Sequence, residues 1–149
     1  EQGMIFTAKI EQTKEYPKRM KYVAETDSFV EKESYSLPYA RKVYQPYGWI
    51  KESGIPPNPH WDIIIMTDKH YELGDEEKVK IIGVFCRNDG DHKFVGVLTD
   101  REINDFSELT EEEKEDMHRL YPKASEGEGW FGREKAEELI KEKTYLRRQ

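Results

Sequence analysis

Residues 79–98, VKIIGVFCRNDGDHKFVGVL, place two apolar segments on either side of a polar turn. The apolar segments, 79–85 and 94–98, have the length and the β-branched content of strands. Asp89-Gly90 lies in the turn between them, and Asp-Gly is the strongest short-range signal for a β-hairpin. We therefore predict a hairpin with residues 88–93 as its polar connection.

Similar short segments precede this hairpin and are separated by turn-forming residues, as at 56–59 and 74–75. They span residues 5–10, 20–23, 29–31, 48–50 and 61–66. No helix-length segment separates them, so the pattern favours a small β-barrel or sandwich over βαβ units.

The pattern becomes helical after residue 105. Thr110 and Glu113 have the spacing of a capping box, which predicts a helix start, and Pro122 predicts its end. A second helix is expected to begin near Arg133. We predict a single α+β domain over residues 4–149, a small β-barrel followed by two helices. Residues 1–3 are expected to be an expression remnant outside it.

Composition excludes several functions. The 149 residues contain 24 Lys and Arg against 31 Asp and Glu, a net charge of −7, with no basic run, which argues against a nucleic-acid partner. The longest aliphatic run, 63–66, is far below the roughly 20 residues that cross a bilayer, so no membrane partner is expected. A single cysteine and no secretory leader predict a cytoplasmic location.

The polar turn has a second interpretation besides a hairpin connection. Asp89 and Asp91 offer carboxylate oxygens, and Lys93 follows them. Mg²⁺ prefers a few carboxylates together with water and phosphate oxygens, so this turn is also a candidate metal–phosphate site. Asp62, directly before an aliphatic strand, is a further candidate ligand.

Aromatic residues gather between Tyr35 and Trp49, interleaved with Arg41 and Lys42. Aromatic and basic residues together are typical of surfaces that stack single-stranded nucleic acid, but the overall acidity argues against that use. Two interpretations stay open: a barrel wall, or a contact surface for a protein partner.

Residues 44–50, YQPYGWI, resemble the Tyr-Pro-x-Asn-Tyr-Gly-Tyr-Ile segment of the soluble, Mg²⁺-dependent inorganic pyrophosphatases of the barrel type, shortened by one residue. Other segments that resemble this family follow in its order and extend the resemblance over most of the chain. They are 21–22, 29–32, 58–65, 83–93, 103–106, 120–123 and 129–130.

The resemblance implies a closed OB-like β-barrel, mainly β, with two C-terminal helices packed on it, in a homo-oligomer. It implies an inorganic diphosphatase that hydrolyses diphosphate, or a related small phosphate-containing substrate, with water activated by Mg²⁺, for which Mn²⁺ can substitute. The positions matched to substrate contacts are Lys21, Lys32, Tyr47, Lys93, Tyr121 and, one position on, Lys123. Those matched to metal ligands are Glu11, Asp62, Asp91 and Asp89, with Asn88 as a less suitable alternative to Asp89.

The sequence departs from the family at several of these positions. Pro57 and Pro59 stand where the signature has its first two aspartates, the second of which helps to activate the attacking water. Val23 replaces a glutamate, and Lys32 replaces an arginine that could grip phosphate with two donors. Pro122 replaces a lysine. Two alternatives to hydrolysis therefore stay open: a non-catalytic protein that binds a phosphate ligand or a metal, and an interaction module.

Overall fold

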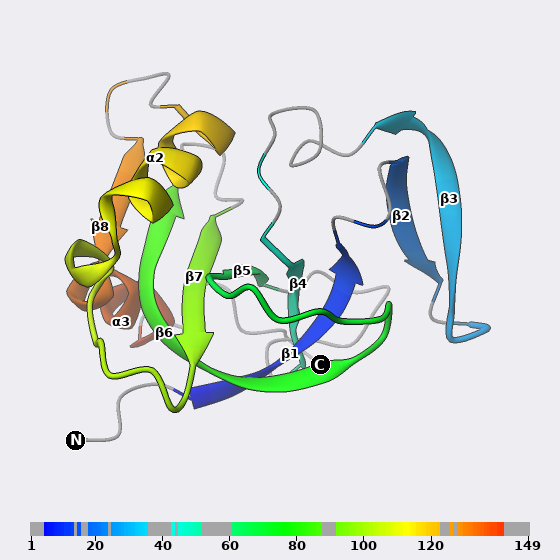
Figure 1. Cartoon of the computed structure of the whole chain (residues 1–149), viewed down its shortest axis with the longest axis horizontal. Coiled ribbons are helices and arrows are strands. Elements are labelled where there is room, and N and C mark those ends of the chain that lie inside the picture. The colour runs from blue at the N-terminus through cyan, green and yellow to red at the C-terminus, as the bar shows by residue number, and fades with distance from the viewer. Residues whose placement is uncertain are drawn as a thin grey trace.

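The computed structural model describes residues 5–13, 15, 18–23, 25–35, 43, 45–51, 61–87, 92–122, 126 and 128–141. Within these ranges the strands precede the helices, except for one unpredicted strand between the last two helices (Figure 1). In chain order the elements are β1 (Ile5–Gln12), β2 (Lys18–Val23), β3 (Ser28–Tyr35), β4 (Tyr47–Ile50), β5 (Asp62–Ile65), β6 (Glu76–Cys86), β7 (Lys93–Leu98), the short 3₁₀ helix η2 (Phe106–Glu108), α2 (Glu111–Leu120), β8 (Gly129–Gly132) and α3 (Arg133–Lys141). No helix in the described ranges is long and apolar enough to cross a membrane.

Five of the described strands close into a barrel (Figure 1). They lie in the order β1-β4-β5-β7-β6, and β1 pairs again with β6. The β5–β7 pair is parallel and the other barrel pairs are antiparallel. Strand β8 continues the sheet along β6. These pairings, with α2 and α3, confirm the predicted mainly β fold, a closed OB-like barrel followed by two helices.

The predicted hairpin at residues 79–98 is present as the antiparallel pair β6 and β7. Its register pairs Phe85 with Lys93 at one end and Val79 with Leu98 at the other. The connection at residues 88–91 lies outside the described residues.

Alternate strand residues separate into two apolar clusters, one on each face of the sheet. Ile63 and Ile65 belong to a cluster with members from all five barrel strands, which therefore fills the barrel interior. Ile64 and Met66 point the other way, into a cluster that includes Met117 of α2. The outer face of the barrel is thus also apolar, because α2 covers it.

The start of α2 follows the predicted capping box. Thr110 Oγ1 accepts from the Glu113 backbone N–H at 3.1 Å, and a Glu113 carboxylate oxygen accepts from the Thr110 N–H at 3.0 Å. Arg101 donates to both oxygens of the same carboxylate at 2.9 and 2.8 Å. Glu113 therefore both caps the helix and ties its first turn to the end of the barrel.

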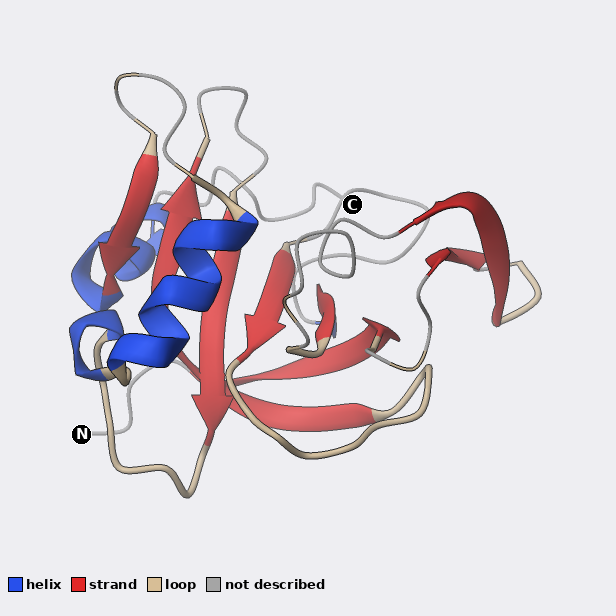
Figure 2. Cartoon of the chain, turned by 45° about the horizontal axis from the view of Figure 1, so that its top comes forward, coloured by secondary structure: helices blue, strands red, loops and turns tan. Residues whose placement is uncertain are grey.

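Strands β2 and β3 form a separate two-stranded sheet that stands beside the barrel (Figure 2). The side chain of Gln12, at the end of β1, connects the two sheets. Its amide nitrogen donates to the Lys18 carbonyl at 3.1 Å, and its amide oxygen accepts from the Met20 N–H at 3.0 Å. Gln12 is buried, so this connection is shielded from competition by water.

Candidate functional site

Asp62 opens β5 and Lys93 opens β7, and the parallel register of these strands places the two residues side by side. Lys93 Nζ donates to Asp62 Oδ2 at 2.5 Å. The ion pair is nearly enclosed, since the side chain of Lys93 is 7% exposed and that of Asp62 is 16% exposed. By strand alternation Asp62 shares the outward face of Ile64, so the pair lies on the outer side of the barrel wall.

Tyr47, the first residue of β4, also contacts this carboxylate oxygen. Its hydroxyl donates to Asp62 Oδ2 at 3.0 Å, and Lys93 Nζ lies 5.9 Å from the centre of its ring. Burial, followed by the nearby Asp62 carboxylate, raises the pKa of Tyr47 well above its usual value. The phenol therefore stays protonated at neutral pH and acts as a hydrogen-bond donor.

Tyr121 reaches this cluster from the end of α2. Its ring stacks on Phe85, with centroids 5.0 Å apart and planes inclined by 16°, and its backbone carbonyl accepts from Trp130 Nε1 at 3.1 Å. Its hydroxyl interacts with that of Tyr47, and burial raises the pKa of the Tyr121 phenol. Two protonated phenols therefore lie next to Lys93 and Asp62.

Glu11, near the end of β1, is the second described carboxylate of the cluster. Burial, and then the Asp62 carboxylate, raise its pKa to about 7, while Lys93, Arg19 and Lys21 oppose this shift. The opposing effects place these three cations within electrostatic reach of the Glu11 carboxylate. Glu11 precedes Gln12, whose side chain bonds to the β2 backbone, so Glu11 lies near the junction of the barrel and the β2–β3 hairpin.

Lys21 and Lys32 come from the hairpin. The register pairs Lys21 of β2 with Val30 of β3 and shifts between Glu31 and Tyr35, so it does not fix the face of Lys32. Both lysines are exposed. Lys21 lies within electrostatic reach of Glu11, and Lys32 lies in β3 next to the register shift.

Three predicted site residues lie outside the described ranges: Asp89, Asp91 and Lys123. The same holds for Asn88, Pro57 and Pro59. Their assignments stay predictions from the sequence. The predicted site residues that lie within the described ranges are Glu11, Lys21, Lys32, Tyr47, Asp62, Lys93 and Tyr121.

The described residues do not by themselves fit a magnesium site. Within the described ranges, no group of three or more His, Cys, Asp or Glu side chains could hold a metal ion. The cluster has two carboxylates, Glu11 and Asp62, and one oxygen of Asp62 already accepts from both Lys93 and Tyr47. Further carboxylate ligands would have to come from elsewhere in the chain.

Arg19 and Arg87 are two cations of this region that the sequence reasoning missed. Arg19 acts on the Glu11 carboxylate, and Arg87, which follows β6, acts on the Tyr121 phenol. Period-two alternation along β2 would have found Arg19, because residues 19 and 21 share one face of a strand. No local pattern marks Arg87.

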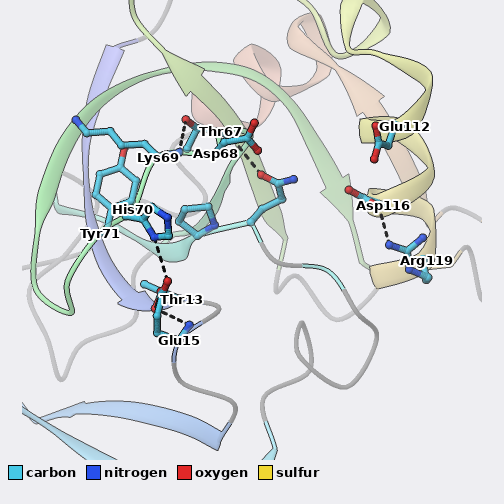
Figure 3. Close-up of a pocket in the computed structure, with 12 residues that line it drawn as sticks. Thr13, Glu15, Thr67, Asp68, Lys69, His70, Tyr71, Glu112, Asp116 and Arg119 are labelled. Atoms are coloured by element: carbon cyan, nitrogen blue, oxygen red, sulfur yellow. Dashed lines mark hydrogen bonds and ion pairs between the residues drawn. The ribbon is translucent and has the colours of Figure 1, made fainter.

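A separate cavity of about 420 Å³ lies between α2 and the segment after β5 (Figure 3). Two pairs of its titratable groups lie in contact. His70 Nδ1 lies 3.0 Å from Glu15 Oε2, and Arg119 donates to Asp116 at 2.6 Å. None of the candidate site residues lines it. The cavity is therefore distinct from the cluster around Lys93.

Comparison by sequence finds no matching family model and no similar curated protein. Comparison of the structure finds several inorganic pyrophosphatases. The Neisseria gonorrhoeae enzyme has a TM-score of 0.73 at 21% identity, over 95% of this chain and 90% of that one. The Ehrlichia chaffeensis enzyme gives 0.71 at 20% identity, over 95% and 96% of the two chains. The Thermus thermophilus enzyme gives 0.69 at 16% identity, over 92% and 87%. The chain therefore has the fold of the inorganic pyrophosphatases over nearly its whole length.

Proposed function

We propose that this protein binds diphosphate at the cluster around Lys93 and hydrolyses it to two phosphates. The supporting observation is the convergence of Lys93, Asp62, Tyr47, Tyr121 and Glu11 on one outer face of the barrel. This convergence occurs in a fold shared with solved structures that are named inorganic pyrophosphatases.

The described side chains suit the binding of a small polyanion. Phosphoryl transfer asks a protein chiefly for positioning and for charge that meets the phosphoryl oxygens. Lys93 and Lys21 supply that charge, and the hydroxyls of Tyr47 and Tyr121 supply neutral donors. Asp62 holds the Lys93 ammonium in place. In the reaction, the water oxygen forms a bond to one phosphorus, and the bond from that phosphorus to the bridging oxygen breaks.

The proposal includes Mg²⁺, with Mn²⁺ as a substitute, because the sequence resembles those of the Mg²⁺-dependent inorganic pyrophosphatases. Asp89 and Asp91 are the candidate ligands that would add to Glu11 and Asp62. A divalent ion bound with the diphosphate would supply positive charge to its oxygens. A cytoplasmic location and assembly as a homo-oligomer likewise stay part of the proposal.

Phosphate release from diphosphate, measured with Mg²⁺ and separately with Mn²⁺, tests the proposed function. Lys21→Ala removes an exposed cation near Glu11, and we expect kcat/KM to fall by about 10-fold or more. Lys78→Ala is the matched control, because it removes the same charge from an exposed site on β6 that pairs with Thr7. Absence of phosphate release by the parent protein with either ion would overturn the proposal.

A second function is a phosphate-binding protein without hydrolysis. It is favoured by the proline residues at positions 57 and 59, which have no side-chain oxygen, and by the presence of only two carboxylates in the described cluster. Calorimetric binding of methylenediphosphonate without turnover of diphosphate would select this function.

A further inference from the structure

The β2–β3 hairpin carries two cations on one face of β2. Arg19 and Lys21 lie two residues apart along this strand, so they share a face. Glu31 of β3 pairs with Met20, so it belongs to the opposite face. The face of β2 that carries Arg19 and Lys21 is thus cationic.

Arg19 is held at the junction between this face and the barrel. The Gln12 side chain binds the backbone on both sides of it, at the Lys18 carbonyl and the Met20 N–H, and Gln12 itself is buried. Because Glu11 precedes Gln12 on β1, the backbone of residue 19 is fixed next to the part of β1 that contributes a carboxylate to the cluster. The electrostatic effect of Arg19 on Glu11 is consistent with that placement.

The described part of the cluster has more positive than negative groups. Its carboxylates are Glu11 and Asp62, and Asp62 is already engaged by Lys93. Arg19 and Lys21 add two cations, and neither makes an ion pair with a carboxylate of the described ranges. Within the described ranges cations thus outnumber carboxylates, and a surface of this charge attracts a polyanion.

We propose that Arg19 is a further phosphate-binding residue of this site, and that with Lys21 it allows the site to bind a diphosphate in the absence of divalent ions. The inference rests on the proposed diphosphate site. Its chemical basis is the guanidinium group, which presents a planar fork of N–H donors that matches two phosphoryl oxygens. Lys32, whose ammonium group lacks this fork of donors, is less suited to contact two phosphoryl oxygens.

Calorimetric titration of the full chain with methylenediphosphonate, in buffer with EDTA, tests this inference. We expect the parent protein to bind, and Arg19→Ala to weaken binding by about 10-fold or more. Arg19→Lys should weaken it by a smaller factor, since it keeps the charge but loses the fork. Lys18→Ala is the matched control, because it removes one charge from the opposite face of the same strand and should change affinity by less than about twofold.

Three outcomes would overturn the inference: no binding by the parent protein in EDTA, parental affinity of the Arg19→Ala variant, or equal losses in the Arg19→Ala and Lys18→Ala variants. Arg19 is exposed, so its loss should leave the fold intact, and matching thermal unfolding curves would verify this. The same variants assayed for phosphate release separate the two proposals. If binding depends on Arg19 but no phosphate is released, the inference stands and hydrolysis is overturned. If phosphate is released and the Arg19→Ala variant binds as the parent protein does, hydrolysis stands and the inference is overturned.

Discussion

Lys93 and Asp62 form the electrostatic centre of the candidate site. A single buried charge costs several kcal/mol, whereas a paired and hydrogen-bonded charge is tolerated. Asp62 Oδ2 accepts from both Lys93 and Tyr47, so its charge is compensated within the chain. Asp62 therefore acts first as the group that orients Lys93.

Replacing Lys93 should destabilise the protein as well as its site. Lys93→Met leaves the Asp62 carboxylate, which is only 16% exposed, without its cation. We expect the free energy of unfolding to fall by about 3 kcal/mol, the lower end for a broken buried pair, because some water still reaches Asp62. Urea denaturation at pH 7 measures this loss.

The double variant Lys93→Met with Asp62→Asn provides the control. It removes the stranded charge together with the cation, so it should recover part of the stability lost in the single variant. A single variant as stable as the parent protein would show that the ion pair is not a structural element of the site.

At the scale of elements, Asp105 joins the 3₁₀ helix η2 to α3. One carboxylate oxygen accepts from the Ser107 N–H at 2.9 Å, and the other accepts from the Arg133 N–H at 2.9 Å. Burial alone would raise the pKa of Asp105, but these backbone donors outweigh it and hold the pKa below its usual value. The carboxylate therefore stabilises the fold in its ionised form.

This arrangement predicts a pH dependence of stability. Because the folded pKa of Asp105 lies below the unfolded one, its contribution is present above the usual value of 3.8 and is lost as the pH falls through the folded pKa. Asp105→Asn should remove this part of the acid sensitivity and lower stability at pH 7 by about 1 kcal/mol. Urea denaturation from pH 7 to pH 2 measures both effects.

The exposed Asp100 provides a control for Asp105, since Asp100→Asn removes a carboxylate at a surface turn. Its unfolding curves should follow those of the parent protein across the pH range. If the stability of the Asp105→Asn variant changed with pH as that of the parent protein does, Asp105 would not be the source of this acid sensitivity.

The elements themselves were largely predictable, because their signals are local. Alternation and turn residues predicted the barrel strands, and the Thr110–Glu113 spacing predicted the start of α2. Strand β8 was not predicted, since its four residues include two glycines and have no alternation of their own. It forms because β1 pairs with β6 only at residues 76–80, which leaves the same edge of β6 available to β8 at residues 83–86.

At the scale of the whole molecule, closure of the barrel brings β1 close to both β4 and β6. Gly48 of β4 makes this approach possible, because a Cβ atom there would lie 2.0 Å from the Lys9 carbonyl oxygen. Backbone atoms cannot move aside as a flexible side chain can. The close contact of β1 and β4 therefore requires glycine at this position.

Gly48→Ala should force these strands apart and lower the free energy of unfolding by about 3 kcal/mol. Gly96→Ala is a milder comparison, because its Cβ would lie 3.1 Å from the end of the Ile63 side chain and 3.2 Å from the Lys80 carbonyl oxygen, and it should lose less. Thermal unfolding of both variants measures the difference. Equal stability of Gly48→Ala and the parent protein would contradict this account of closure.

The net charge of the molecule does not describe its site. The chain carries −7 overall, yet the described cluster combines two carboxylates with Arg19, Lys21 and Lys93. Acidic residues gather elsewhere, as in the first turn of α2, where their charges interact favourably with the positive end of the helix dipole. An acidic protein can thus present a locally cationic surface to a small anion.

The sequence by itself determined the order of α2, α3 and the described strands other than β8, and the residue types available for phosphate chemistry, because these depend on neighbours within a few residues. Tertiary structure alone decided that Asp62 and Lys93 meet, through the parallel register of two strands that are not neighbours in the chain. It also decided that the backbone around Arg19 is tied to the end of β1, next to Glu11, through a Gln12 side chain that joins two sheets. Such contacts depend on long-range packing and strand register, which no local pattern encodes.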